Sequence, residues 1–213
     1  MAKRIGKYNV SKRESELSLS DGGTVSGALT VTGATTLTGN SGLSAGTGIT
    51  GGTDTVYNSW TTNNGGIITT YIYIDMDGLI GAGGAKDVIG KVSTANCHLG
   101  QIGDTSTCGT LFAGRMTCLE TPAAGETDID LYASNVATGT ENVAYDHSDM
   151  GTETALLTAG AAWSSDLSAN QYNVAGFTGL PNANDYLYMV KGGTNSTSEY
   201  TGGKFLIELF GTV

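Results

Sequence analysis

The stretch IITTYIYIDMDG, residues 67–78, decides the fold class because its β-branched and aromatic side chains favour an extended strand. Similar runs follow along the chain, and clusters of Gly, Asn and Asp separate them. The further predicted strands are 86–93, 96–103, 110–119, 127–133, 153–157, 171–177, 186–191 and 204–210. Short strands with turn signals at this spacing predict an all-β protein whose residues 67–213 form a β-sandwich head, of the jelly-roll type.

Three segments of this region allow a second interpretation or act as connections. Residues 155–163 are rich in Ala and Leu, so a short helix is an alternative to a strand there. The run FLIELF, residues 205–210, is apolar on both faces apart from its Glu, which fits either a central strand or a contact face between subunits. Residues 51–66 are rich in turn formers and predict a joint, in which Tyr57 and Trp60 close the lower end of the head.

Residues 15–50 contain an internal repeat with a period of six. Cut into hexads, the segment reads SELSLS, DGGTVS, GALTVT, GATTLT, GNSGLS and AGTGIT. The sixth position always carries a hydroxyl group. The fifth position is always aliphatic, at Leu19, Val25, Val31, Leu37, Leu43 and Ile49. This period is typical of β-solenoids and fibrous shafts, in which a small residue permits a bend between short extended runs.

One aliphatic residue per hexad cannot bury a core within a single chain. The repeat would also form fewer stacked turns than a single-chain coil generally needs. Chains that wrap around a shared axis would enclose their aliphatic rows, and three rows leave no side of the axis open to water. The hexads therefore predict a homotrimeric shaft. The alternative is a disordered Gly/Ser/Thr linker, which would have no reason to keep the phase of the repeat.

Charge is distributed unevenly along the chain. The first thirteen positions hold half of the ten basic residues, while the remaining residues carry a net charge of −15. The basic residues of this N-terminal segment are Lys3, Arg4, Lys7, Lys12 and Arg13. Nucleic acid would repel so acidic a body, so residues 1–14 predict an arm that docks on an acidic protein surface. The alternative is a frayed, solvated terminus. No apolar stretch is long enough to span a membrane.

No group of residues predicts catalysis, and no cofactor is expected. The segment YDHSD, residues 145–149, holds the residue types of a hydrolase triad, but neighbours in sequence cannot adopt the triad geometry. Cys97, Cys108 and Cys118 lack the close pairing of zinc ligands. Buried thiols that act as small apolar side chains are the favoured interpretation.

Three acidic residues, Glu126, Asp128 and Asp130, alternate along a predicted strand and therefore share one of its faces. Like charges in such a row repel each other unless water or a cation separates them. A solvated face is the first interpretation, and a calcium site is the alternative.

The opening MAKRIGKYNVSKRESELSLSDGGTV resembles the N-termini of structural proteins of marine tailed phages. The stretch GALTVTGATTLTG is similar to the low-complexity shafts of phage fibre and capsid-decorating proteins, and the end YTGGKFLIELFG is similar to the terminal strand of such virion proteins. The resemblance covers the first fifty residues and the last dozen. It implies a trimeric attachment on the particle, either a decoration (cement) protein or a head fibre, and it supplies no catalytic residues.

The expected function is therefore that of a non-enzymatic virion protein, assembled in the host cytoplasm. Its arm would bind the major capsid protein, and the protein would stabilise the capsid or project from its outside. The alternative is a tail fibre or receptor-binding protein whose head recognises host surface glycans. Aromatic residues in loops are the candidates for glycan contact: Tyr57, Trp60, Trp163 and Tyr172.

Overall fold

The computed structural model describes residues 42–81, 83–102, 107–144, 148–159, 162–166, 171–194 and 196–213. The chain divides into a first unit, Met1–Leu37, and a second unit, Thr38–Val213, and every described residue belongs to the second unit. The predicted arm and the first four hexads of the predicted shaft lie outside the described residues.

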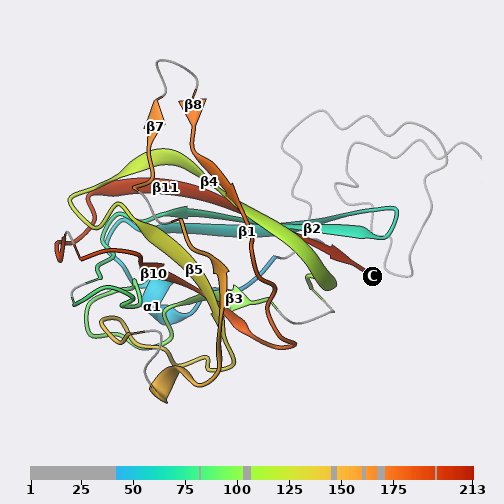
Figure 1. Cartoon of the computed structure of the whole chain (residues 1–213), viewed down its shortest axis with the longest axis horizontal. Helices are drawn as coiled ribbons and strands as arrows, with labels where there is room; N and C mark the ends of the chain where they lie inside the picture. Colours follow the sequence, from blue (N-terminus) through green and yellow to red (C-terminus); the bar gives the residue numbers. More distant parts are fainter. Residues whose placement is uncertain are drawn as a thin grey trace, which may run out of the picture. The chain divides into compact units, whose positions relative to one another are not determined.

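The second unit is nearly all β, with two antiparallel sheets that form a sandwich-like fold (Figure 1). The five-stranded sheet has the order β1-β2-β11-β4-β9, made of Val56–Asn64 (β1), Ile67–Asp75 (β2), Gly202–Thr212 (β11), Thr110–Ala123 (β4) and Val174–Gly176 (β9). The four-stranded sheet has the order β3-β10-β5-β6, made of His98–Gln101 (β3), Tyr186–Lys191 (β10), Ile129–Ser134 (β5) and Glu153–Leu157 (β6). The remaining elements are a two-stranded ribbon and two short helices: Ser165–Asp166 (β7), Gln171–Tyr172 (β8), Thr47–Thr50 (α1) and the 3-10 helix Ser148–Met150 (η1).

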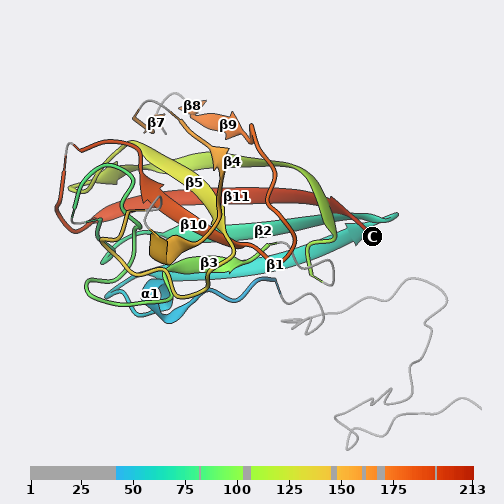
Figure 2. The same ribbon diagram turned by 60° about the horizontal axis from the view of Figure 1, so that its bottom comes forward.

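The strands pair in a nested order. β5 pairs with β6, β4 with β9, β3 with β10 and β2 with β11, and every pair is antiparallel. Successive pairs lie alternately in the four-stranded and the five-stranded sheet. The chain therefore crosses between the sheets at most connections, and β1 is added beside β2 at the edge. Figure 2 shows β4, β11, β2 and β1 running side by side.

Most of the predicted strands are confirmed, including the first and the last. The predictions at 67–78, 96–103, 110–119, 127–133, 153–157, 186–191 and 204–210 correspond to β2, β3, β4, β5, β6, β10 and β11. The prediction at 171–177 corresponds to two short strands, β8 and β9. The run FLIELF lies in β11, between β2 and β4, so it is a central strand. Phe205, Ile207 and Leu209 point into the core, which explains the apolar composition of its inner face.

Two local predictions and one alternative are wrong. Residues 86–93 form isolated bridges in place of a strand, because positive φ angles at Lys86 (71°) and Ser93 (55°) interrupt the extended backbone at both ends. The Ala/Leu-rich run at 155–163 begins with the last three residues of β6, so it does not start a helix. The predicted joint at 51–66 contains β1, which pairs with β2 without a register shift.

The described part of the last two hexads, residues 42–50, belongs to the head, so the predicted shaft does not extend to residue 50. Leu43 and Ile49 are buried in the main hydrophobic core, and α1 replaces the extended conformation that the hexad pattern predicts there. Gly46 donates its N–H to the carbonyl of His98 on the edge strand β3. A Cβ atom at Gly46 would lie 2.0 Å from the carbonyl oxygen of Asn96, so this glycine permits close approach of two backbones.

The three cysteines are buried, and none forms a disulfide. Burial raises the pKa of Cys97 to about 12 and that of Cys118 to about 11. Thiols in this state are poor nucleophiles and poor metal ligands. The prediction of small apolar thiols is confirmed.

Candidate functional site

The outward side of the five-stranded sheet carries a group of side chains, which we call the aromatic face; all are partly exposed except Glu208, which is 7% exposed. These side chains alternate with inward-facing residues, which are mostly buried along β2, β11 and β4 and half-buried along β1. The uncharged members of the aromatic face are Trp60, Tyr71, Tyr73, Leu206 and Phe210. Its charged members are Asp75, Arg115, Glu120, Lys204 and Glu208.

The strand register places the centre of the aromatic face on one line across four strands. Trp60 lies opposite Tyr71, Tyr71 opposite Glu208, and Glu208 opposite Arg115. The rings of Trp60 and Tyr71 stack with their centroids 5.1 Å apart and their planes 12° from parallel. Trp60 nevertheless keeps 40% of its surface exposed, because β1 is the edge strand. A broad indole surface is therefore available to a partner.

The charged residues of the aromatic face pair with one another. Arg115 binds Glu208 through two nitrogens, Nε and Nη2, and the Nη2–Oε1 distance is 2.9 Å. These hydrogen bonds to Glu208, together with its negative charge, raise the pKa of Arg115. Lys204 forms ion pairs with Glu120 and, at 3.5 Å, with Asp75. Three carboxylates thus face two cations, and the local net charge is close to zero.

Arg115 also contributes to the aromatic character of this surface. Its guanidinium lies 5.9 Å from the centroid of the Phe210 ring, within the range of a cation–π interaction. Half of the Arg115 side chain is exposed, so the paired guanidinium remains open to a partner. Side chains of these types on a sheet surface suit binding to another surface by stacking and packing.

Four aromatic residues are predicted to contact a ligand, and of the three whose side chains the structure describes, one lies on the aromatic face. Trp60 does so, whereas Trp163 is 1% exposed in the core. Tyr57 points inward, and its hydroxyl donates a hydrogen bond of 2.5 Å to the carbonyl of Leu99. Burial accordingly raises the pKa of Tyr57. The structure does not describe the side chain of Tyr172.

The other aromatic members of the face are not among the predicted residues, although the sequence carries a signal for two of them. In IITTYIYID, Tyr71 and Tyr73 alternate with Ile72 and Ile74, which are fully buried. Since neighbouring side chains on a strand point to opposite faces, this alternation already places both tyrosines outward.

The acidic residues Glu126, Asp128 and Asp130 do not form the predicted solvated face. Glu126 is 1% exposed, and its carboxylate accepts the backbone N–H groups of Thr127 and Asp128. Asp130 is 9% exposed and accepts the N–H of Ala159 at 2.7 Å. One oxygen of Asp128 is buried without a hydrogen-bond partner within the described ranges. Among the described residues, no group of three His, Cys, Asp or Glu is placed to hold a metal ion.

We expect Asp128→Asn to stabilise the head at neutral pH. Burial raises the pKa of Asp128 above its ordinary value of 3.8, and the charges of Asp130 and Glu126 raise it further. The folded head therefore binds the proton of this carboxyl more tightly than the unfolded chain does, and protonation stabilises it. This stabilisation is fully present at pH values below 3.8 and is lost as the pH rises through the raised pKa of the folded state. The variant should melt at a higher temperature than the wild type at pH 7, and the difference should shrink toward pH 3.

The control for this prediction is Asp54→Asn, because Asp54 is an exposed carboxylate with a positive φ that Asn also tolerates. It should leave the melting temperature nearly unchanged at both pH values. If a cation bound by the three carboxylates stabilised the head, Asp128→Asn would instead lower the melting temperature at pH 7.

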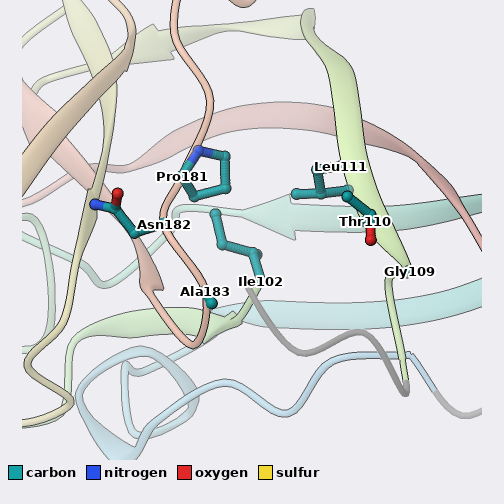
Figure 3. Close-up of a pocket in the computed structure, with 7 residues that line it drawn as sticks. All are labelled: Ile102, Gly109, Thr110, Leu111, Pro181, Asn182 and Ala183. Atoms are coloured by element: carbon teal, nitrogen blue, oxygen red, sulfur yellow. The ribbon is translucent and has the colours of Figure 1, made fainter.

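A small pocket lies at the start of β4 (Figure 3). Its volume is about 180 Å³, and its lining residues are Ile102, Gly109, Thr110, Leu111, Pro181, Asn182 and Ala183. Among the described residues that line the pocket, none has a charged side chain, and the backbone N–H of Asn182 already donates to Asp185. The pocket therefore offers space for a small apolar group, and its described lining supplies no carboxylate, imidazole or thiol.

The other predicted sites lie partly or wholly outside the described residues. These are the docking residues Lys3, Arg4, Lys7, Lys12 and Arg13, the shaft residues Leu19, Val25, Val31 and Leu37, and residues 145–147 of the YDHSD segment. In the described part of the chain, neither helix is long and apolar enough to cross a membrane. Comparison with protein-family models, with curated proteins and with solved structures finds no match to this chain.

Proposed function

We propose that this protein is a non-enzymatic structural protein of a phage virion that decorates the outside of the capsid or projects from it. The nested strand order is the observation that carries the proposal. The four nested pairs give sheets of order β2-β11-β4-β9 and β3-β10-β5-β6, which support a jelly-roll head with β1 added at one edge. Jelly rolls are common in viral capsid proteins and in lectins.

In this proposal the N-terminal segment anchors the protein to the major capsid protein. The five basic side chains of residues 1–14 are opposite in charge to an acidic capsid surface, and the body of the chain, at −15, would not bind such a surface by itself. Four hexads, with Leu19, Val25, Val31 and Leu37, form the homotrimeric shaft that links this anchor to the head.

We expect deletion of residues 1–13 to abolish binding to virus particles while the head stays folded. Each exposed ion pair contributes less than about 1 kcal/mol, so binding depends on all five basic residues together and should weaken as salt rises. Cosedimentation of the purified protein with undecorated particles, repeated across a salt series, measures both effects.

The matched control keeps the length of the arm but replaces Lys3, Arg4, Lys7, Lys12 and Arg13 with glutamine. It should lose binding as fully as the deletion, because the docking is electrostatic. Binding that survives the deletion undiminished would show that the anchor lies elsewhere in the chain.

The second candidate function is recognition of host surface glycans by the head of a tail fibre. The exposed Trp60, stacked on Tyr71, favours it, since aromatic rings are common platforms for sugar rings and jelly rolls also occur in lectins. The location on the particle separates the two functions. Many copies spread over the head indicate decoration, whereas a few copies at the tail indicate receptor binding.

A further inference from the structure

We infer that the aromatic face is the surface through which the heads of two copies of this chain contact each other. The inference rests on the homo-oligomer in the proposed function and is independent of where the oligomer is attached. It identifies the contact surface, and it names a second copy of the chain as the partner.

The side chains of the aromatic face are those that protein interfaces favour. Interface centres are enriched in Tyr, Trp, Phe and Arg, and most of the binding energy comes from a few residues of these types. Trp60 and Arg115 are large and exposed, at 40% and 50%, and Tyr71 and Phe210 flank them. Small-molecule sites are usually concave, whereas these side chains stand on the outside of a sheet.

The charge pattern identifies the partner. The chain beyond Arg13 carries −15, so two copies repel each other over most of their surfaces. Five basic residues occur in that part of the chain, and the aromatic face holds two of them, Arg115 and Lys204, each paired with carboxylates. Repulsion between copies is therefore weak at this surface. A strongly basic or strongly acidic partner would find no complementary charge here, but a second copy needs none.

The shortened shaft gives an independent reason for a contact between heads. Leu43 and Ile49 pack in the core of their own head, so four of the six aliphatic residues per chain remain for the axis. The apolar area that the shaft can bury between chains decreases in proportion. Packing of the aromatic face against another head supplies apolar contact that the shaft lacks.

The test uses the two tryptophans of the full-length protein. Trp163 is 1% exposed, so a neutral quencher such as acrylamide reaches only Trp60 while the head stays folded. If a second copy covers the aromatic face, the Stern–Volmer constant of Trp60 in the assembled wild type should be several-fold below that of a tryptophan with two fifths of its surface exposed.

A charged variant provides the reference for the uncovered state. Leu206→Glu puts a further carboxylate on the aromatic face and should raise the quenching of Trp60 several-fold. Val92→Glu is the matched control, because Val92 is an apolar side chain, 55% exposed, in the loop between β2 and β3. This substitution adds the same charge away from the aromatic face and should leave the quenching unchanged.

The quenching of wild-type Trp60 decides the inference even if Leu206→Glu does not fold. A Trp60 that is fully quenchable at every protein concentration overturns it. So does a Trp60 that is exposed in solution and becomes protected only when neutral oligosaccharides or virus particles are added, since the face would then bind those partners.

Particle binding that persists while Trp60 is exposed in solution refutes this inference alone. Protection of Trp60 without particle binding supports the inference and contradicts the proposed function.

Discussion

Replacing Ile49 with alanine should lower the free energy of unfolding of the head by about 2–5 kcal/mol. Ile49 is fully buried, and it belongs to the same core cluster as Leu79, Ile89 and Leu99. Its neighbour Gly48 packs so closely that a Cβ atom there would lie 2.3 Å from the Sγ of Cys97. The backbone of α1 is therefore held against the head and has little freedom to fill the cavity. Urea denaturation, followed by the fluorescence of the buried Trp163, measures the loss.

The matched variant is Leu37→Ala. Leu37 is the aliphatic residue of the fourth hexad and the last residue of the first unit of the chain. The variant truncates an aliphatic residue of the same repeat, but it should leave the unfolding of the head unchanged and act only on the association of chains. Equal effects of the two variants on head stability would contradict the boundary that we place between the shaft and the head.

The strands of the head could be predicted because their signal is local. Alternation with period two in IITTYIYID reports which side chains face the core and holds in β2, and the apolar run FLIELF marks β11 as a central strand. The sheet order could not be predicted in the same way. The nested pairing joins strands that are far apart in sequence, such as β2 and β11, and no local pattern encodes that choice.

The boundary of the shaft was misplaced because a repeat does not say what its aliphatic residues pack against. The column from Leu19 to Ile49 keeps one phase, but its last members fill the core of the head. β1 was not predicted because its polar composition hides its alternation. Its Asn, Ser and Thr residues read as turn formers, while the alternation of inward Tyr57 and Ser59 with outward Trp60 marks a strand.

The candidate site could be predicted only in part, because exposure depends on tertiary structure. Trp60 and Trp163 are hard to tell apart in the sequence, since polar residues follow both of them. The structure puts Trp60 on an edge strand and Trp163 between the sheets. Repulsion between the carboxylates at 126–130 favours a solvated face, but backbone N–H groups bind two of them in the interior.

Replacing Trp163 with alanine should lower the free energy of unfolding by about 3–5 kcal/mol. The indole packs edge to face on Phe205 of the five-stranded sheet, with the ring centroids 5.6 Å apart. Its Nε1–H donates a hydrogen bond of 2.7 Å to the carbonyl of Ile129 on the four-stranded sheet. Trp163 thus joins the two sheets, and its truncation leaves both a cavity and a buried carbonyl without this donor.

Two further variants separate these contributions. Trp163→Phe keeps an aromatic ring near Phe205 but removes the donor to Ile129, so its stability should fall between those of the wild type and Trp163→Ala. Trp60→Ala removes the same side chain from the exposed aromatic face, where stacking on Tyr71 contributes about 1 kcal/mol. Chemical denaturation followed by far-ultraviolet circular dichroism compares all four proteins, because that signal does not depend on either tryptophan being present. If Trp163→Ala is no less stable than Trp60→Ala, then Trp163 does not join the two sheets, and the core depends on other contacts.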